Sequence, residues 1–106
     1  PFRYYFRNSK RRFKDFNLTL EYLKQLWETQ KGVCPYSGIQ LNLAEYNRNH
    51  NDPIYTASLD RIDSNKGYVI GNVQFISTCI NYMKSTMSHE DTIKICKIIA
   101  NNFLLD

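Results

Sequence analysis

The segment 58-SLDRIDSNKGYVIGNVQF-75, followed by 81-NYMK-84, contains the clearest secondary-structure pattern in the chain. Residues 57–62 have the composition of a short strand, and the polar run 63–67 that follows is a strong turn signal. A second strand is predicted over residues 68–75. The segment therefore predicts a β-hairpin.

Helices are predicted on both sides of this hairpin. Gly71-Asn72 marks a bulge or a tight loop within the second strand, and a helix over residues 77–85 follows it. Thr19 is a suitable N-cap for an earlier helix that ends near Gln30, and a final helix begins at Ser88. The sequence predicts an α+β fold in which a hairpin and its helix are flanked by further helices.

The final helix carries a regular apolar stripe, which predicts that one of its faces packs against the core. Cys96 lies on that stripe and is therefore expected in the core. The stripe consists of Ile93, Cys96, Ile99, Ala100 and Phe103.

Size and composition limit the classes of protein that the chain can represent. Its 106 residues suit one small domain, and a content of 42% hydrophobic residues excludes a disordered tail. No apolar run approaches the ~20 residues of a membrane span. The three cysteines form no Cys-x-x-Cys pair and are odd in number, which argues against a disulfide framework.

The basic charge is concentrated at the N-terminus. The first fourteen residues contain six basic and no acidic residues, although the net charge of the whole chain is only +4. Aromatic residues are interleaved with the basic ones, a mixture that suits a phosphate backbone and exposed bases. A solvated basic end with its aromatics on the core is the plainer interpretation. An anionic membrane surface is a weaker one, because no clean amphipathic helical period is evident. The basic residues are Arg3, Arg7, Lys10, Arg11, Arg12 and Lys14.

These observations divide the chain into a basic aromatic arm, residues 1–16, and a folded domain, residues 17–106. Within the domain, Asp60 and Asn81 offer hard oxygen ligands that suit Mg²⁺. Lys84 follows Asn81 by one helical turn and is placed to reach a phosphate. On spacing alone, a surface ion pair of Asp60 and an ordinary exposed asparagine are the commoner interpretations.

The hairpin segment and 81-NYMK-84 resemble the HNH endonuclease superfamily, whose members share a ββα-metal finger. The segment 26-LWETQKGVC-34 and the dipeptide Ser37-Gly38 extend the resemblance to a phage- and virus-type branch, over roughly residues 17–104. The resemblance implies a divalent-metal-dependent DNA endonuclease.

Roles for individual residues also follow from the resemblance. Asp60 and Asn81 would be ligands of one Mg²⁺ or Mn²⁺ ion. Asn72 would pin the loop between the strands by backbone hydrogen bonds, and Lys84 would contact a phosphate.

One departure from the superfamily concerns the general base, which is normally a histidine directly after the first metal ligand. Arg61 occupies this position, and arginine stays protonated at neutral pH, so it can clamp a phosphate but cannot deprotonate water. The candidates for a replacement base are His50, His89, Tyr68 and Lys66. Each also has an ordinary structural explanation, as a residue of the long loop, the helix start, the strand and the turn, respectively.

A second departure concerns zinc, which many relatives bind through two Cys-x-x-Cys pairs. The corresponding positions here are Cys34, Ser37, Ser77 and Ile80, so no structural zinc is expected and apolar packing is expected to replace it.

The sequence thus predicts a DNA endonuclease, with RNA as the alternative substrate and a non-catalytic nucleic-acid-binding module as the alternative function. The nucleic-acid contacts are expected from the arm, Lys66 and Lys84. No membrane partner is expected, and the oligomeric state is left open. The expected location is the cytoplasm of a bacterium or of a phage-infected or virus-infected cell, with an organelle as the alternative.

Overall fold

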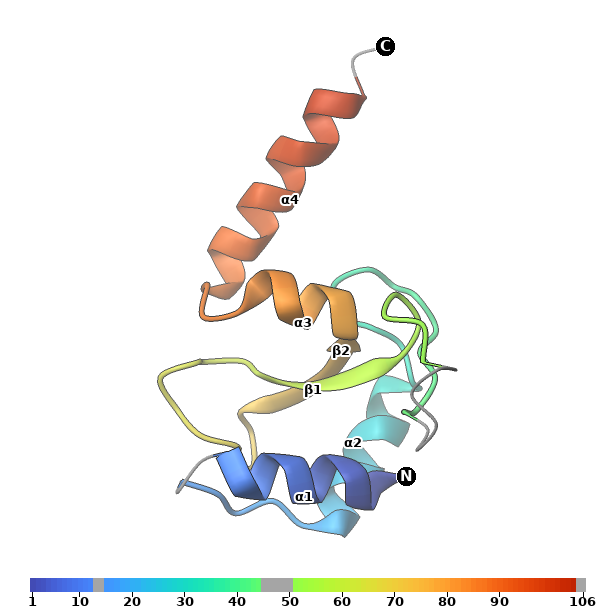
Figure 1. The fold of residues 1–106 in the computed structure, drawn as a ribbon, viewed down its shortest axis with the longest axis vertical. Helices are drawn as coiled ribbons and strands as arrows, with labels where there is room; N and C mark the ends of the chain where they lie inside the picture. Colours follow the sequence, from blue (N-terminus) through green and yellow to red (C-terminus); the bar gives the residue numbers. More distant parts are fainter. Residues whose placement is uncertain (13–14, 45–50, 105–106) are drawn as a thin grey trace.

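The computed structural model describes residues 1–12, 15–44 and 51–104, and its element order confirms the predicted α+β class. β1 and β2 form an antiparallel hairpin in which Asp60 lies directly opposite Gln74. The hairpin is followed at once by a helix and is flanked by three others (Figure 1). The elements are α1 (Phe2–Arg12), α2 (Leu20–Gln30), β1 (Ala57–Arg61), β2 (Val73–Ser77), α3 (Thr78–Lys84) and α4 (His89–Phe103).

The hairpin lies between α1 on one face and α3 on the other (Figure 1). Successive side chains of a strand point to opposite faces, so Leu59 and its partner Phe75 share the α1 face. The Phe75 ring is fully buried and makes edge-to-face contacts with Tyr5 and Trp27, at centroid distances of 5.2 and 5.3 Å. This aromatic cluster is the centre of the hydrophobic core. Asp60 lies on the opposite side of β1.

Both edges of the two-stranded sheet are closed by side chains, which matters because an isolated hairpin is only marginally stable. On the β1 edge, the Tyr5 hydroxyl donates to the Ala57 carbonyl at 2.8 Å. Burial raises the pKa of Tyr5 to about 12. On the β2 edge, the amide of Gln30 pairs with the backbone of Phe75, with N–O distances of 2.9 and 2.8 Å. Helices α1 and α2 therefore complete the hydrogen bonding of the sheet.

The predicted N-terminal arm is a helix, and this corrects the sequence analysis. Phe2, Tyr5, Phe6 and Ser9 recur at helical spacing, and all are buried or half-buried against the rest of the domain. Tyr5 belongs to the same hydrophobic core as the strands. The boundary expected at residue 16 therefore does not separate two structural units. The helical period was obscured by the arginines between these positions.

The second strand begins later than predicted, at Val73 rather than residue 68. Residues 68–72 instead complete a tight connection, in which Tyr68 forms an isolated bridge with Phe16. A side chain at Gly67 would collide with the backbone carbonyl of Asp15, so the chain can pass this point only as glycine. The turn is consequently built against the N-terminal segment.

The N-cap residues in the sequence predicted the bounds of α2 and the start of α4 correctly. The Thr19 hydroxyl accepts a hydrogen bond from the Tyr22 N–H at 3.0 Å, and Ser88 accepts one from the Asp91 N–H at 3.0 Å. Beyond α2, Lys31 adopts a left-handed conformation with φ of 56°. These caps confirm the predicted helix boundaries.

Beyond Ile93, which is half-buried, the apolar stripe of α4 is exposed, contrary to the prediction. The helix projects away from the hairpin layers (Figure 1). Cys96 is exposed, and Phe103 retains 73% of its accessible surface. Helical spacing shows that residues share a face, but it cannot show whether another element covers that face. Among the described residues, no helix combines the length and apolarity needed to cross a membrane.

Candidate functional site

A cleft of about 600 Å³ runs along β1 between α1 and α3. Its walls include side chains from both helices, and its floor is formed by β1 and the turn that follows it. The structure therefore brings together five residues that the sequence analysis had singled out. They are Arg12, Asp60, Arg61, Tyr68 and Asn81.

The Asp60 carboxylate is the most buried charged group of this cleft, with 3% of the residue exposed. The Lys84 ammonium donates to both carboxylate oxygens at 2.9 Å, and also to the Arg61 carbonyl at 2.9 Å. The Gln74 amide donates to Oδ2 of Asp60 at 3.0 Å. Asp60 is thus held in one orientation by a cation from α3 and an amide from the opposite strand.

This ion pair corrects the role expected for Lys84. Only 1% of the residue is exposed, so its ammonium is not presented to a phosphate on the surface. A buried carboxylate needs a compensating charge, and Lys84 is the group that supplies it.

Asn81 reaches the same cleft one helical turn before Lys84. Its Nδ2 donates to the Ser58 hydroxyl at 2.7 Å and, at 3.5 Å, to the Leu59 carbonyl. Ser58 precedes Asp60 by two residues, so both side chains lie on the α3 side of β1. Because the nitrogen of Asn81 already donates to β1, the amide oxygen is the atom of this side chain that can serve as a ligand.

Asn72 has the positioning role that the resemblance implied. Its Nδ2 donates to the carbonyls of Asp63 and Gly67, at 3.1 and 2.9 Å, and its Oδ1 accepts from the Asp63 N–H at 2.9 Å. The side chain is buried. It fixes the turn between the strands and does not line the cleft.

Arg61 stabilises the same turn from the cleft side. Its Nη1 donates to the carbonyls of Ser64 and Lys66, at 2.8 and 3.2 Å, and its guanidinium lies 5.6 Å from the centre of the Tyr68 ring. The guanidinium is therefore held at the cleft in a fixed orientation, which is the arrangement required of a phosphate clamp.

The candidate general bases are not gathered together. His89 is exposed, does not line the cleft, and its Nδ1 lies 3.0 Å from the Tyr36 hydroxyl. Tyr68 lines the cleft but is buried beside Arg61. Lys66 is exposed in the turn, and His50 lies outside the described residues. Of the described candidates, Tyr68 is the one that lines the cleft.

A chain of polar contacts leads from Asp60 through Gln74 and Tyr36 to the exposed side chain of His89. Burial and the negative charge of Asp60 raise the pKa of Tyr36, while a hydrogen bond with Gln74 lowers it in part. Tyr36 in turn contacts His89. Gln74, Tyr36 and Ser58 thus belong to the surroundings of the site, and the sequence analysis did not identify them. Gln74 could have been found from the hairpin register, once β2 is known to begin at Val73.

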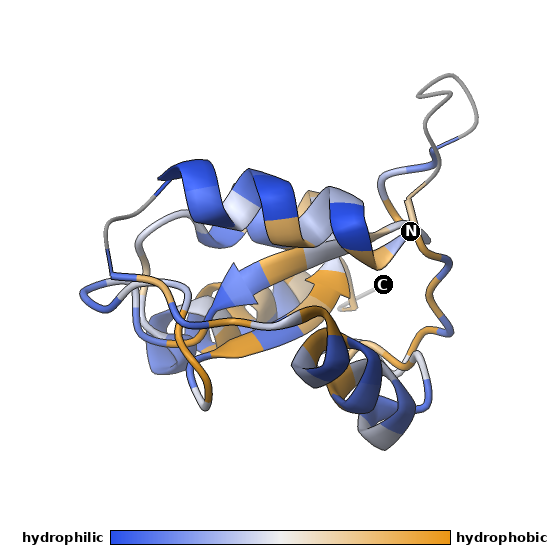
Figure 2. Cartoon of the chain, turned by 90° about the horizontal axis from the view of Figure 1, so that it is seen from below, coloured by the Kyte–Doolittle hydropathy of each residue, from blue (hydrophilic) through white to orange (hydrophobic). Residues whose placement is uncertain are grey.

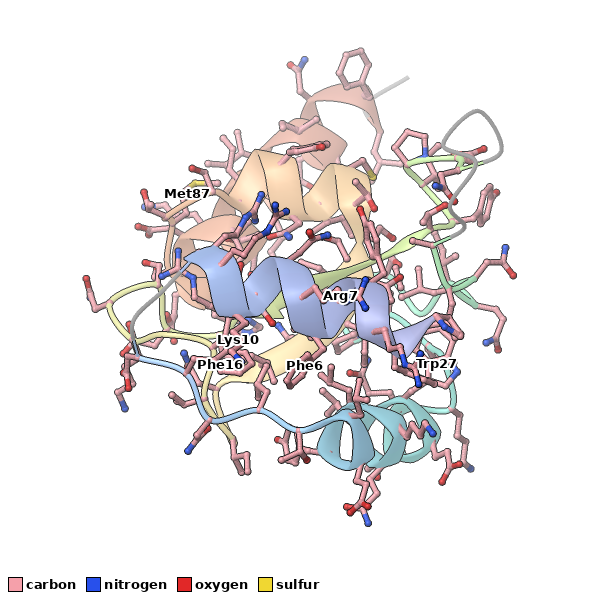
Figure 3. The ribbon with its side chains drawn as sticks, turned by 60° about the horizontal axis from the view of Figure 1, so that its bottom comes forward. Phe6, Arg7, Lys10, Phe16, Trp27 and Met87 are labelled. Atoms are coloured by element: carbon pink, nitrogen blue, oxygen red, sulfur yellow. The ribbon has the colours of Figure 1, made fainter. Side chains whose placement is uncertain are left out.

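The outer surface of α1 is basic. Figure 2 shows hydrophilic residues along most of this helix, whereas the strands carry both hydrophobic and hydrophilic residues. Lys10 lies beside Phe6, its ammonium 5.8 Å from the ring centre (Figure 3). Lys14 lies outside the described residues, whereas Arg12 lines the cleft. The other basic side chains of α1 are exposed along the helix, namely Arg3, Arg7, Lys10 and Arg11.

Three of the four positions compared with zinc ligands in the sequence analysis, Cys34, Ser37 and Ser77, are linked by hydrogen bonds. Burial would raise the pKa of Cys34. Hydrogen bonds from the Ser37 side chain and from the backbone of Ser37, Ser77 and Tyr36 outweigh that effect and lower the pKa. Cys34 is fully buried, so these bonds join the end of α2 to the end of β2.

A carboxylate, that of Asp60, and an amide, that of Asn81, line one cleft. Asp60 already binds a cation, the Lys84 ammonium, at both oxygens. Within residues 1–12, 15–44 and 51–104, no group of three His, Cys, Asp or Glu side chains gathers around one point. A divalent ion at Asp60 would therefore rely on Asn81, water and substrate oxygens for its other ligands, as Mg²⁺ commonly does.

Comparison with known proteins gives one informative relative. The chain is 36% identical, over 87 residues, to a protein of enterobacteria phage T4 described as the uncharacterized 29.0 kDa protein in the dda-modA intergenic region. The alignment covers 82% of this chain and 32% of the phage protein, so the chain corresponds to a part of that relative. No family model and no solved structure matches the chain.

Proposed function

We propose that the chain is a divalent-metal-dependent endonuclease of the HNH type that hydrolyses phosphodiester bonds in DNA. The observation that carries the proposal is the joint presence of Asp60, Arg61 and Asn81 in one cleft, contributed by adjoining elements. A carboxylate, an amide oxygen and a fixed guanidinium together can bind a metal ion and a phosphate.

In this proposal Asp60 and Asn81 hold Mg²⁺ or Mn²⁺, which when bound supplies charge stabilisation at the leaving oxygen. Arg61 clamps the scissile phosphate, oriented by its bonds to the turn that Asn72 fixes. The exposed basic residues of α1 bind the DNA backbone without reading sequence. Lys84 must then share Asp60 with the metal ion or move away from it.

A non-catalytic nucleic-acid-binding module is the second candidate, and a specific contact favours it. Lys84 satisfies both oxygens of Asp60, and Arg61 stands where the superfamily has its base. If Lys84 never leaves Asp60, the same surface binds nucleic acid without cutting it. RNA is the alternative substrate in either case. The relative from a phage supports action in the cytoplasm of an infected bacterial cell.

Nicking of supercoiled plasmid tests the proposal. With Mg²⁺ or Mn²⁺ present, we expect the unmodified chain to cut DNA, and EDTA to abolish cutting. Asp60→Asn and Asn81→Ala are each expected to lower the rate by ~10²–10³, the usual cost of removing one group that stabilises a transition state. Asp60→Asn leaves the buried Lys84 ammonium without its anion, so its rate is compared only where its circular dichroism matches that of the unmodified chain. Asn101→Ala, an exposed asparagine of α4, is the matched control and should cut normally.

The same assay separates the two candidate functions. Equal cutting by all variants would show that the activity is not located in this cleft. Absence of cutting together with salt-sensitive DNA binding would favour the binding module. His89→Ala is expected to keep its activity because this side chain does not line the cleft, whereas His50→Ala and Tyr68→Phe test the remaining candidate bases.

A further inference from the structure

We infer that the cleft along β1 takes an unpaired stretch of DNA, so that single-stranded or locally opened DNA is the preferred ligand. This inference rests on the proposed nucleic-acid function and names its substrate class. The observations that carry it are the size of the cleft, the aromatic side chains on its two walls and the amide of Asn8.

The size of the cleft favours a single strand over a duplex. A volume of about 600 Å³ lies in the ~300–1,000 Å³ range of pockets that enclose one small molecule. Such a space suits roughly one or two nucleotides. A B-form duplex is larger than this space, since its major groove alone is about 12 Å wide. A duplex can lie across the cleft but cannot enter it.

A tyrosine stands on each wall of the cleft, and aromatic rings on which bases stack are typical of single-strand binding sites. Tyr82 projects from α3 with 79% of its surface exposed, so its ring is accessible to a base. Tyr4 lies on the α1 wall and is half-buried. A base that enters the cleft would cover Tyr82 and supply the apolar partner that it lacks on the protein side.

The polar side chains of the cleft suit the remaining parts of a nucleotide. Asn8 on α1 accepts a hydrogen bond from Arg11 at its amide oxygen, so its amide nitrogen can donate to a base edge, which is accessible in an unpaired strand. Arg12 ends the α1 wall and continues the basic outer surface of that helix. The backbone of a strand can therefore follow α1 while its bases turn into the cleft.

Fluorescence anisotropy in EDTA, where no cutting takes place, tests this inference. The probes are a labelled single-stranded oligonucleotide and a hairpin duplex of the same sequence. We expect the unmodified chain to bind the single strand more tightly. We expect Tyr82→Ala to weaken that binding by roughly 5- to 150-fold, the range given by loss of one stacked base. Binding of the hairpin should change little.

Tyr55→Ala is the matched control, because Tyr55 is 47% exposed and lies outside the cleft. Both substitutions are at the surface, so both variants should keep the circular dichroism of the unmodified chain. Equal affinity for the two probes, or equal losses in Tyr82→Ala and Tyr55→Ala, would overturn the inference. Single-strand binding that depends on Tyr82 would support it even if plasmid nicking fails, so the two proposals are tested separately.

Discussion

Replacement of Lys84 by methionine is expected to lower the free energy of unfolding by about 3–5 kcal/mol, the usual cost of breaking a buried ion pair on one side. The ammonium of Lys84 pairs with the Asp60 carboxylate at 2.9 Å, and both residues are almost fully buried. Methionine fills most of the space but leaves a negative charge without its partner. Urea denaturation at pH 7 measures the loss.

Two further variants separate the charge effect from packing. Asp60→Asn combined with Lys84→Met removes both charges and keeps an acceptor for Gln74, so it should recover most of the lost stability. Lys94→Met, at an exposed position of α4, should be nearly neutral. If Lys84→Met alone proved as stable as the unmodified chain, the buried ion pair would not form in solution.

Phe75→Ala is expected to be equally severe, with a loss of about 3–5 kcal/mol. Phe75 is fully buried and contacts aromatic rings from α1 and α2, so its removal leaves a cavity where three elements meet. Small domains are stable by only ~5–15 kcal/mol, and this loss is therefore a large part of the total. Thermal and urea unfolding are the measurements.

Phe103→Ala provides the control for this substitution, since the same ring is removed from a position that is 73% exposed. Its effect should stay within about 0.5 kcal/mol. Similar losses in the two variants would mean that α4 is packed in solution and that the core is not centred on Phe75.

The parts of the fold predicted correctly are those fixed by local chemistry. The hydroxyls of Thr19 and Ser88 cap their helices within one turn of sequence. The polar run before Gly67 marks the turn by its composition, although the turn also packs against the N-terminal segment. Asn72 was assigned its role from the resemblance, and its hydrogen-bond partners, Asp63 and Gly67, lie within the same loop. Neighbours in sequence were enough to predict the two helix caps.

The features that were missed depend on how elements pack. The ion pair between Lys84 and Asp60 depends on the position at which α3 packs against β1, and no local sequence pattern records this position. The exposure of the α4 stripe likewise depends on the direction in which the helix leaves the body. The prediction for α1 was wrong for a different reason. Tyr5 and Ser9 do have helical spacing, but the exposed basic residues of this segment outnumber them.

Binding of Mn²⁺, measured by isothermal titration and by electron paramagnetic resonance without DNA, tests most directly whether Asp60 and Asn81 share one cation. We expect the unmodified protein and Asn101→Ala each to bind one ion per chain. Asn81→Ala and Asp60→Asn should each bind the ion at least tenfold more weakly, in line with the ~10–100-fold losses of metal affinity that follow changes around a metal ion. Binding that is undetectable in the unmodified chain, or unchanged in both site variants, would contradict a shared metal site and leave Lys84 as the permanent partner of Asp60.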